Sequence, residues 1–193
     1  TTGCLRLQRQ YPAVVAYVLD PGAPPAGKSG AGVQGVTLKV RPLRVAPMFD
    51  GRKLIYEQPG PTWTSDFYHE WFIEPAPMIT GIMQQWLAAA GVAGQVVHGA
   101  SLVPATHVLE GTILELYGDY TDANQPRAAL ALELLLLEDR GDAAPRIALH
   151  KTYREQAPLA GARPQDLITG WNEALRRILD AFDKDLAGVK FPP

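Results

Sequence analysis

Cysteine is nearly absent: Cys4 is the one thiol in 193 residues. An internal disulfide is therefore excluded, and with it the class of small secreted domains that disulfides stabilise. A zinc site built from several thiolates is excluded as well, and the four histidines include no pair at the spacing of a metal-binding helix. We therefore expect no metal and no other cofactor.

Long apolar runs and surplus positive charge are also missing. No apolar run approaches the ~20 residues that a membrane-spanning helix needs. The formal net charge is -2, so the basic surface that nucleic-acid binding requires is lacking. We expect no nucleic-acid partner.

The composition is that of a globular protein, with 47% hydrophobic and 20% charged residues. Two helices are predicted from apolar residues at helical spacing. The first includes residues 79–90, preceded by Pro75 and Pro77 and followed by Gly91. The second covers residues 166–187, before Gly188.

Strands are predicted where apolar residues alternate with polar ones or where β-branched residues cluster. Residues 128–137 are ambiguous, because Ala, Leu and Glu favour helix, but their period of two favours a strand. A break is expected at Pro42, where the apolar alternation changes parity. The predicted strands are residues 13–19, 36–45 with this break, 54–57, 106–117, 128–137 and 146–155.

These elements predict one α+β domain over residues 12–189, after an N-terminal segment of residues 1–11. The expected architecture is a two-layer sandwich, in which a mostly antiparallel sheet carries both amphipathic helices on one face.

A glycine- and proline-rich stretch, residues 22–29, has the Gly-x4-Gly-Lys-Ser spacing of a phosphate-binding loop. A small P-loop NTPase is therefore one alternative. Pro24 and Pro25 remove two of the N–H donors that such a loop uses, and a strand-like sequence follows instead of a helix. We favour a linker.

Aromatic residues cluster just before the first helix, and they include Trp63, Phe67, Tyr68 and Trp71. Two interpretations stay open, core packing and an apolar contact surface for a partner or a lipid. The alternation of residues 67–72 would place Phe67 and Trp71 on one face of a strand. The candidate contact residues are Tyr56, Trp63, Phe67, Tyr68 and Trp71.

Several short motifs occur in a recognisable order: Cys4 near the start, a strand that ends in Leu19-Asp20-Pro21, Leu54-Ile55-Tyr56, and Tyr68-His69-Glu70-Trp71 leading to Pro75 and the first helix. In this order the chain resembles the ABC-type transport auxiliary lipoprotein family. The resemblance extends from Cys4 to about residue 189.

The resemblance implies a non-catalytic lipoprotein that acyl chains on Cys4 attach to a membrane. Its expected place is the periplasmic side of the cell envelope, at the outer membrane. Its implied partners are an MCE-type lipid-binding protein and an ABC transporter in an intermembrane lipid transport system, and it could form a homo-oligomer. One acyl chain anchors a protein only marginally, so stable attachment requires more than one. An envelope structural or assembly lipoprotein is the other alternative.

Overall fold

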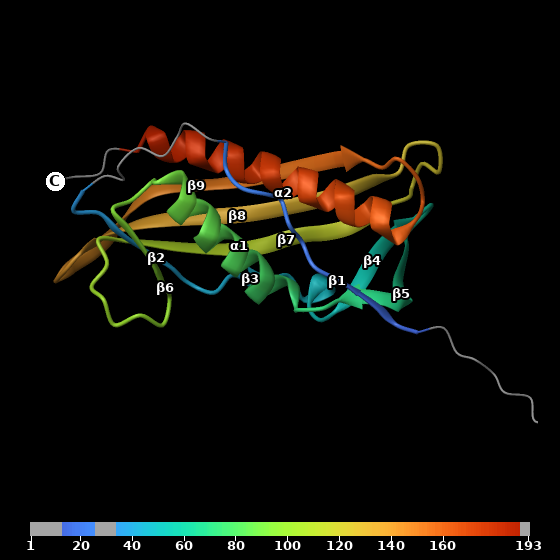
Figure 1. The fold of residues 1–193 in the computed structure, drawn as a ribbon, viewed down its shortest axis with the longest axis horizontal. Coiled ribbons are helices and arrows are strands. Elements are labelled where there is room, and N and C mark those ends of the chain that lie inside the picture. The colour runs from blue at the N-terminus through green and yellow to red at the C-terminus, as the bar shows by residue number, and fades with distance from the viewer. Residues whose placement is uncertain (1–12, 26–33, 190–193) are drawn as a thin grey trace, which may run out of the picture.

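A computed structural model of the protein describes residues 13–25 and 34–189. Within these ranges the chain forms two α-helices and a nine-stranded sheet (Figure 1). In chain order the elements are β1 (Val15–Tyr17), β2 (Thr37–Val40), β3 (Arg44–Val45), the 3-10 helix η1 (Pro47–Phe49), β4 (Lys53–Gln58), β5 (Thr62–Trp71), α1 (Pro75–Ala90), β6 (Gln95–His98), β7 (His107–Asp119), β8 (Arg127–Arg140), β9 (Ala143–Pro158) and α2 (Pro164–Ala187).

The long strand β7 organises the sheet. One of its edges pairs antiparallel with β8, which in turn pairs antiparallel with β9. Its other edge accepts three short strands in succession, β2, β3 and β4, all parallel to it. β5 pairs antiparallel with β4 and parallel with β1, and β6 pairs with β2. The longest pairings are thus antiparallel, and most of the short N-terminal strands are added in parallel.

Pro42 explains why β2 and β3 are separate. Proline has no N–H to donate to a neighbouring strand, so the ladder is interrupted there. The next N–H, that of Leu43, donates instead to the Thr80 hydroxyl of α1 at 2.9 Å. The break thus also connects the sheet to a helix.

Local sequence sets the ends of both helices. α1 begins at a proline and ends at Gly91, whose φ of 64° is left-handed and therefore suits glycine. α2 begins with a reciprocal capping arrangement between Arg163 and Asp166 and also has a proline in its first turn.

The hydrophobic core lies between the sheet and the two helices, which cover the same face (Figure 1). Trp71 of β5 and Trp171 of α2 meet in it with ring centroids 5.0 Å apart, and Tyr153 of β9 packs edge-on against Phe182 of α2. Both tryptophans are fully buried, so the core extends from the β5 end of the sheet to β9.

The opposite face of the long strands carries ion pairs between strands. His150 of β9 pairs with Glu133 of the neighbouring β8 at 3.0 Å, and Arg154 of β9 reaches across β8 to Glu115 of β7 at 3.2 Å. Such cross-strand pairs stabilise a solvated sheet face.

The predicted α+β sandwich is confirmed, and so is the strand assignment of residues 128–137, which lie in β8. β6 was not predicted, and β5 is longer than the alternation of residues 67–72 indicated. β6 has four residues and its neighbours are glycine-rich, so it offers little periodicity to detect.

Candidate functional site

A bulge in β5 is the most irregular feature of the sheet. The pairing between β4 and β5 changes from Lys53 opposite Glu70 to Ile55 opposite Ser65. Residues 66–69 of β5 therefore lie opposite a single residue of β4. Such bulges re-aim side chains and terminate regular pairing.

Asp66 holds the bulge together. Its Oδ1 accepts the main-chain N–H groups of Tyr68 and His69, both at 2.9 Å, in the manner of an Asx turn. Its Oδ2 accepts the Tyr56 hydroxyl at 2.7 Å, and the His69 Nδ1 lies 3.0 Å from both oxygens. The ring of Tyr17 from β1 stacks on His69 with centroids 6.0 Å apart.

The protonation states follow from these contacts. Burial, and then the hydrogen bond to Asp66, raise the pKa of the Tyr56 hydroxyl well above its usual value. Burial alone would raise the pKa of Asp66, but the bonds from Tyr56, Tyr68 and His69 outweigh it and lower that pKa. A protonated Tyr56 and an ionised Asp66 thus fix the backbone of the bulge and hold the next residues in place.

The bulge exposes apolar side chains at the β1–β5 end of the sheet. Phe67 is 73% exposed, and its ring lies edge-on against Tyr68. Further exposed apolar residues come from β1 and from the turn between β5 and α1. We call this set the edge surface: Val14, Val15, Phe67, Tyr68, Phe72 and Ile73. Clustered exposed apolar residues mark interaction sites more often than isolated ones do.

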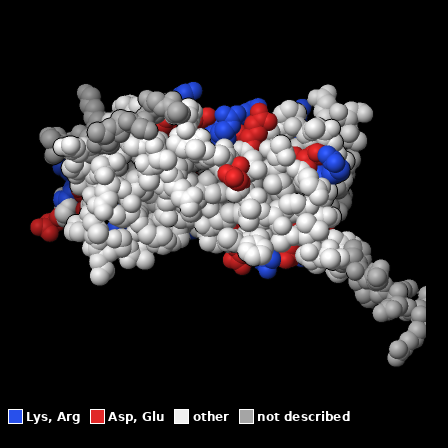
Figure 2. Space-filling model, in the orientation of Figure 1, with Lys and Arg blue, Asp and Glu red and all other residues white. Residues whose placement is uncertain are grey.

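A second unusual surface surrounds α1. Residues 75–109 contain no Asp, Glu, Lys or Arg. In Figure 2 the surface over α1 is almost free of charged side chains, whereas charged side chains lie along α2. The sequence interpretation missed this surface, although the uncharged run was visible in the sequence.

The protein family of this chain is identified by a match over most of its sequence. Residues 17–182 match a family model described as ABC-type transport auxiliary lipoprotein component. The chain belongs to this family. No protein in a search of curated proteins matches it significantly. The family's description, an auxiliary lipoprotein component of ABC-type transport, implies a protein anchored to a membrane of the cell envelope.

Solved structures share the fold of this auxiliary lipoprotein. Protein XCC0632 of Xanthomonas campestris has a TM-score of 0.70 at 15% identity, over 89% of this chain and 90% of that one. An uncharacterised protein gives 0.68 at 10% identity, over 92% and 99%. The hypothetical protein CT253 of Chlamydia trachomatis gives 0.53 at 9% identity, over 79% and 98%. At these identities the likeness concerns the fold.

The structure separates the candidate contact residues of the auxiliary lipoprotein. Phe67 and Tyr68 lie on the edge surface, and Tyr56 is partly buried beneath the bulge. Trp63 is 38% exposed but lies with Phe49 and Tyr117 in a separate aromatic cluster. Tyr117 follows the core residue Leu116 in β7, so this cluster lies on the sheet face away from the helices.

The prediction that Trp71 is a contact residue was wrong. It is only 1% exposed and packs against Trp171, so it belongs to the core and cannot contribute to a contact surface. The expectation that it shares a face with Phe67 was wrong, because the bulge at residues 66–69 interrupts the alternation between them.

Cys4, the expected lipid-bearing residue, lies outside the described residues, and so do Gly27, Lys28 and Ser29 of the phosphate-loop-like stretch. The next described element after that stretch is the strand β2, whereas a phosphate-binding loop leads into a helix. Across the described ranges no helix combines the length and apolarity needed to span a membrane. In the same residues, no three acidic, histidine or cysteine side chains gather in a way that could hold a metal ion.

Proposed function

We propose that this auxiliary lipoprotein is the periplasm-facing, non-catalytic component of an intermembrane lipid transport system, with an MCE-type lipid-binding protein and an ABC transporter as partners. Acyl chains on Cys4 hold it at the outer membrane. Family membership supports the transport role, and the position of the sole cysteine supports the anchor.

The observation that carries the proposal is the edge surface. Val14 lies ten positions after Cys4 in the sequence. At no more than about 3.6 Å per residue, this length of chain keeps Val14, one member of the edge surface, within about 36 Å of the acylated residue. An apolar surface so close to the membrane suits contact with an envelope partner, and we assign it to the MCE-type protein.

The anchor is tested on the full-length precursor expressed in a bacterial envelope. Mass spectrometry of the N-terminal peptide from isolated outer membranes should show cleavage before Cys4 and acylation of its thiol. Cys4→Ala should leave an unprocessed or soluble form. An unmodified Cys4 in an uncleaved chain would contradict the proposal.

The partner contact is tested by co-purification with the products of the neighbouring transport genes. The double variant Phe67→Ser and Phe72→Ser should lose the MCE-type protein. Ile147→Ser is the matched control, because Ile147 is also exposed and apolar but lies on β9. Equal recovery from both variants would reject the edge surface as the contact.

An anchored protein that recovers no transport component would instead indicate an envelope structural or assembly lipoprotein. The proposal also allows a homo-oligomer, which sedimentation of the processed protein would reveal.

A further inference from the structure

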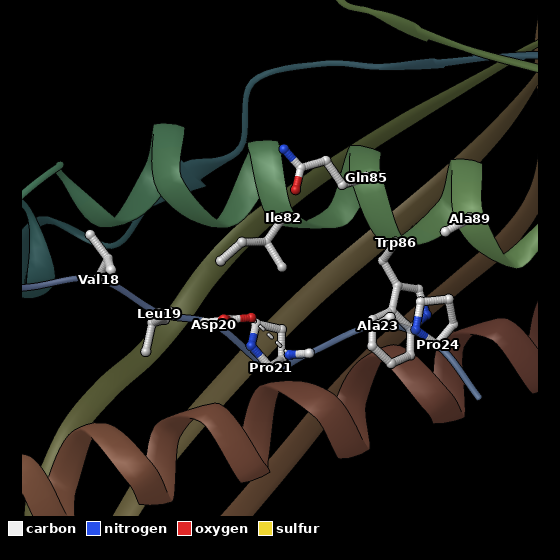
Figure 3. Close-up of a pocket in the computed structure, with 11 residues that line it drawn as sticks. Val18, Leu19, Asp20, Pro21, Ala23, Pro24, Ile82, Gln85, Trp86 and Ala89 are labelled. Carbon is white, nitrogen blue, oxygen red and sulfur yellow. Dashed lines mark hydrogen bonds between the residues drawn. The ribbon is translucent and has the colours of Figure 1, made fainter. Parts of the chain in front are cut away.

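A groove separates α1 from residues 18–24, the segment that leaves β1 and passes along the helix (Figure 3). Its volume is about 690 Å³, within the range of about 300–1,000 Å³ that is usual for small-molecule sites. In Figure 3, Ile82 and Trp86 point from α1 toward this segment, which contributes Pro21 and Pro24. The side chain of Gln85 points away from it.

The groove contains one unusual polar atom. Trp86 is only 3% exposed, and its indole Nε1 has no hydrogen-bond partner among the described residues. A buried N–H without an acceptor is unfavourable, and nearly all such groups in proteins are paired. Trp86 lines the groove but its Nε1 is itself covered, so a ligand whose acceptor oxygen displaces the covering atoms could supply the missing partner.

The charge around the groove selects the kind of ligand. No Lys or Arg lines it, and α1 carries no charge at all. The one charged residue of the lining is Asp20, whose carboxylate accepts the Gly22 N–H at 3.0 Å. A phosphate or a free carboxylate would therefore meet an acid without a compensating cation, which disfavours both.

We infer that the groove binds one acyl chain of an uncharged lipid ester, with the ester carbonyl accepting the Trp86 indole N–H and the hydrocarbon packing against Ile82, Pro21 and Pro24. The ligand is a separate lipid molecule and not the anchor on Cys4. The inference rests on the proposed function, because it gives the transport component a direct contact with lipid.

Binding is tested on the full 193-residue chain without acylation, with 2-bromoethyl decanoate as the probe, because its bromine lies beside the ester group. Bromine quenches indole fluorescence only at contact distance. We expect saturable quenching of the wild-type protein, loss of this quenching in Trp86→Phe, and its retention in Trp63→Phe. Absence of quenching, or the same quenching in both variants, would overturn the inference.

Two alanines of α1 give a matched pair that leaves the indole in place. Ala89 lines the groove, whereas Ala88 is also exposed but does not line it. Ala89→Phe should weaken probe binding about tenfold or more, and Ala88→Phe should leave it unchanged. Equal affinities would place the probe elsewhere and reject the groove.

Three further comparisons distinguish the occupant. As competitors of the probe, the decanoate anion should bind more weakly than methyl decanoate, and tighter binding of the anion would reject an uncharged ligand. If quenching occurs only after residues 26–33 are replaced by a shorter linker, this chain's own segment fills the groove and the inference fails. If the acylated protein in nanodiscs shows no quenching while the unacylated chain does, the anchor is the occupant and the inference likewise fails. The quenching and competition measurements on the unacylated chain are independent of acylation at Cys4 and of partner recovery, by which the proposed function is tested.

Discussion

The indole Nε1 of Trp171 in α2 donates a hydrogen bond of 3.0 Å to the main-chain carbonyl of Ala129 in β8, and both residues are fully buried. Trp86 in α1 is similarly buried, but its indole N–H has no such partner within residues 13–25 and 34–189. We therefore expect Trp171→Phe to lower the free energy of unfolding by about 1–3 kcal/mol more than Trp86→Phe does. Urea denaturation with unchanged m-values measures the difference, and equal losses would show that the bond contributes nothing.

Trp86 nevertheless anchors α1 through its ring. Trp86→Ala should lower the free energy of unfolding by about 3–5 kcal/mol, because a large buried side chain leaves a cavity. Trp63→Ala is the comparison, and its loss should be smaller because Trp63 is partly exposed. A loss below about 1 kcal/mol for Trp86→Ala in urea would contradict this role.

Two helical glycines should respond oppositely to alanine. A Cβ at Gly170 would lie 2.7 Å from Leu159 Cδ2 and 2.8 Å from the Ala128 Cβ, whereas at Gly81 nothing lies within 4 Å. Gly81→Ala should stabilise the protein by about 0.5–1 kcal/mol, since alanine favours helix. Gly170→Ala should instead destabilise it by about 1–3 kcal/mol through overpacking. Thermal unfolding of the two variants gives the signs, and a stabilising Gly170→Ala would mean that α2 can move away from β8.

The bulge should contribute a pH-dependent stability. The pKa of Asp66 is lowered in the folded protein, so its contribution is present above the ordinary value of 3.8 and is lost as the pH falls through the lowered pKa. Asp66→Asn should be less stable than the wild type at neutral pH, and the gap should shrink below pH 3.8. Denaturation at a series of pH values tests this, and a gap independent of pH would assign the role of Asp66 to geometry alone.

The periodicity of apolar residues was enough to predict secondary structure where the side chains pack regularly. Apolar alternation identified β8 in spite of its helix-favouring residues, because only a strand puts Leu130, Leu132 and Leu134 on one buried face. The parity change at Pro42 likewise marked the break between β2 and β3.

The candidate sites depend on contacts that periodicity cannot encode. Asp66 accepts main-chain N–H groups of its own strand, and the resulting bulge separates Phe67 from Trp71, which were expected on one face. The groove requires residues 18–24 to lie beside α1, which begins about fifty residues later in the chain. Neither relation leaves a regular pattern in the sequence, although the uncharged residues 75–109 do.

The position of β1 decides how the domain bears tension. Among the described residues β1 is the first strand, and it joins the sheet through three parallel pairs with β5: Val15 with His69, Ala16 with Glu70, and Tyr17 with Trp71. A pull along β1 would load these hydrogen bonds in shear, so they must break together, whereas a pull across β1 would open them one after another. Because β5 continues almost directly into α1, the load would pass from this edge to the helix that lines the groove. Strain on the N-terminal side of the chain is thereby mechanically connected to the uncharged surface.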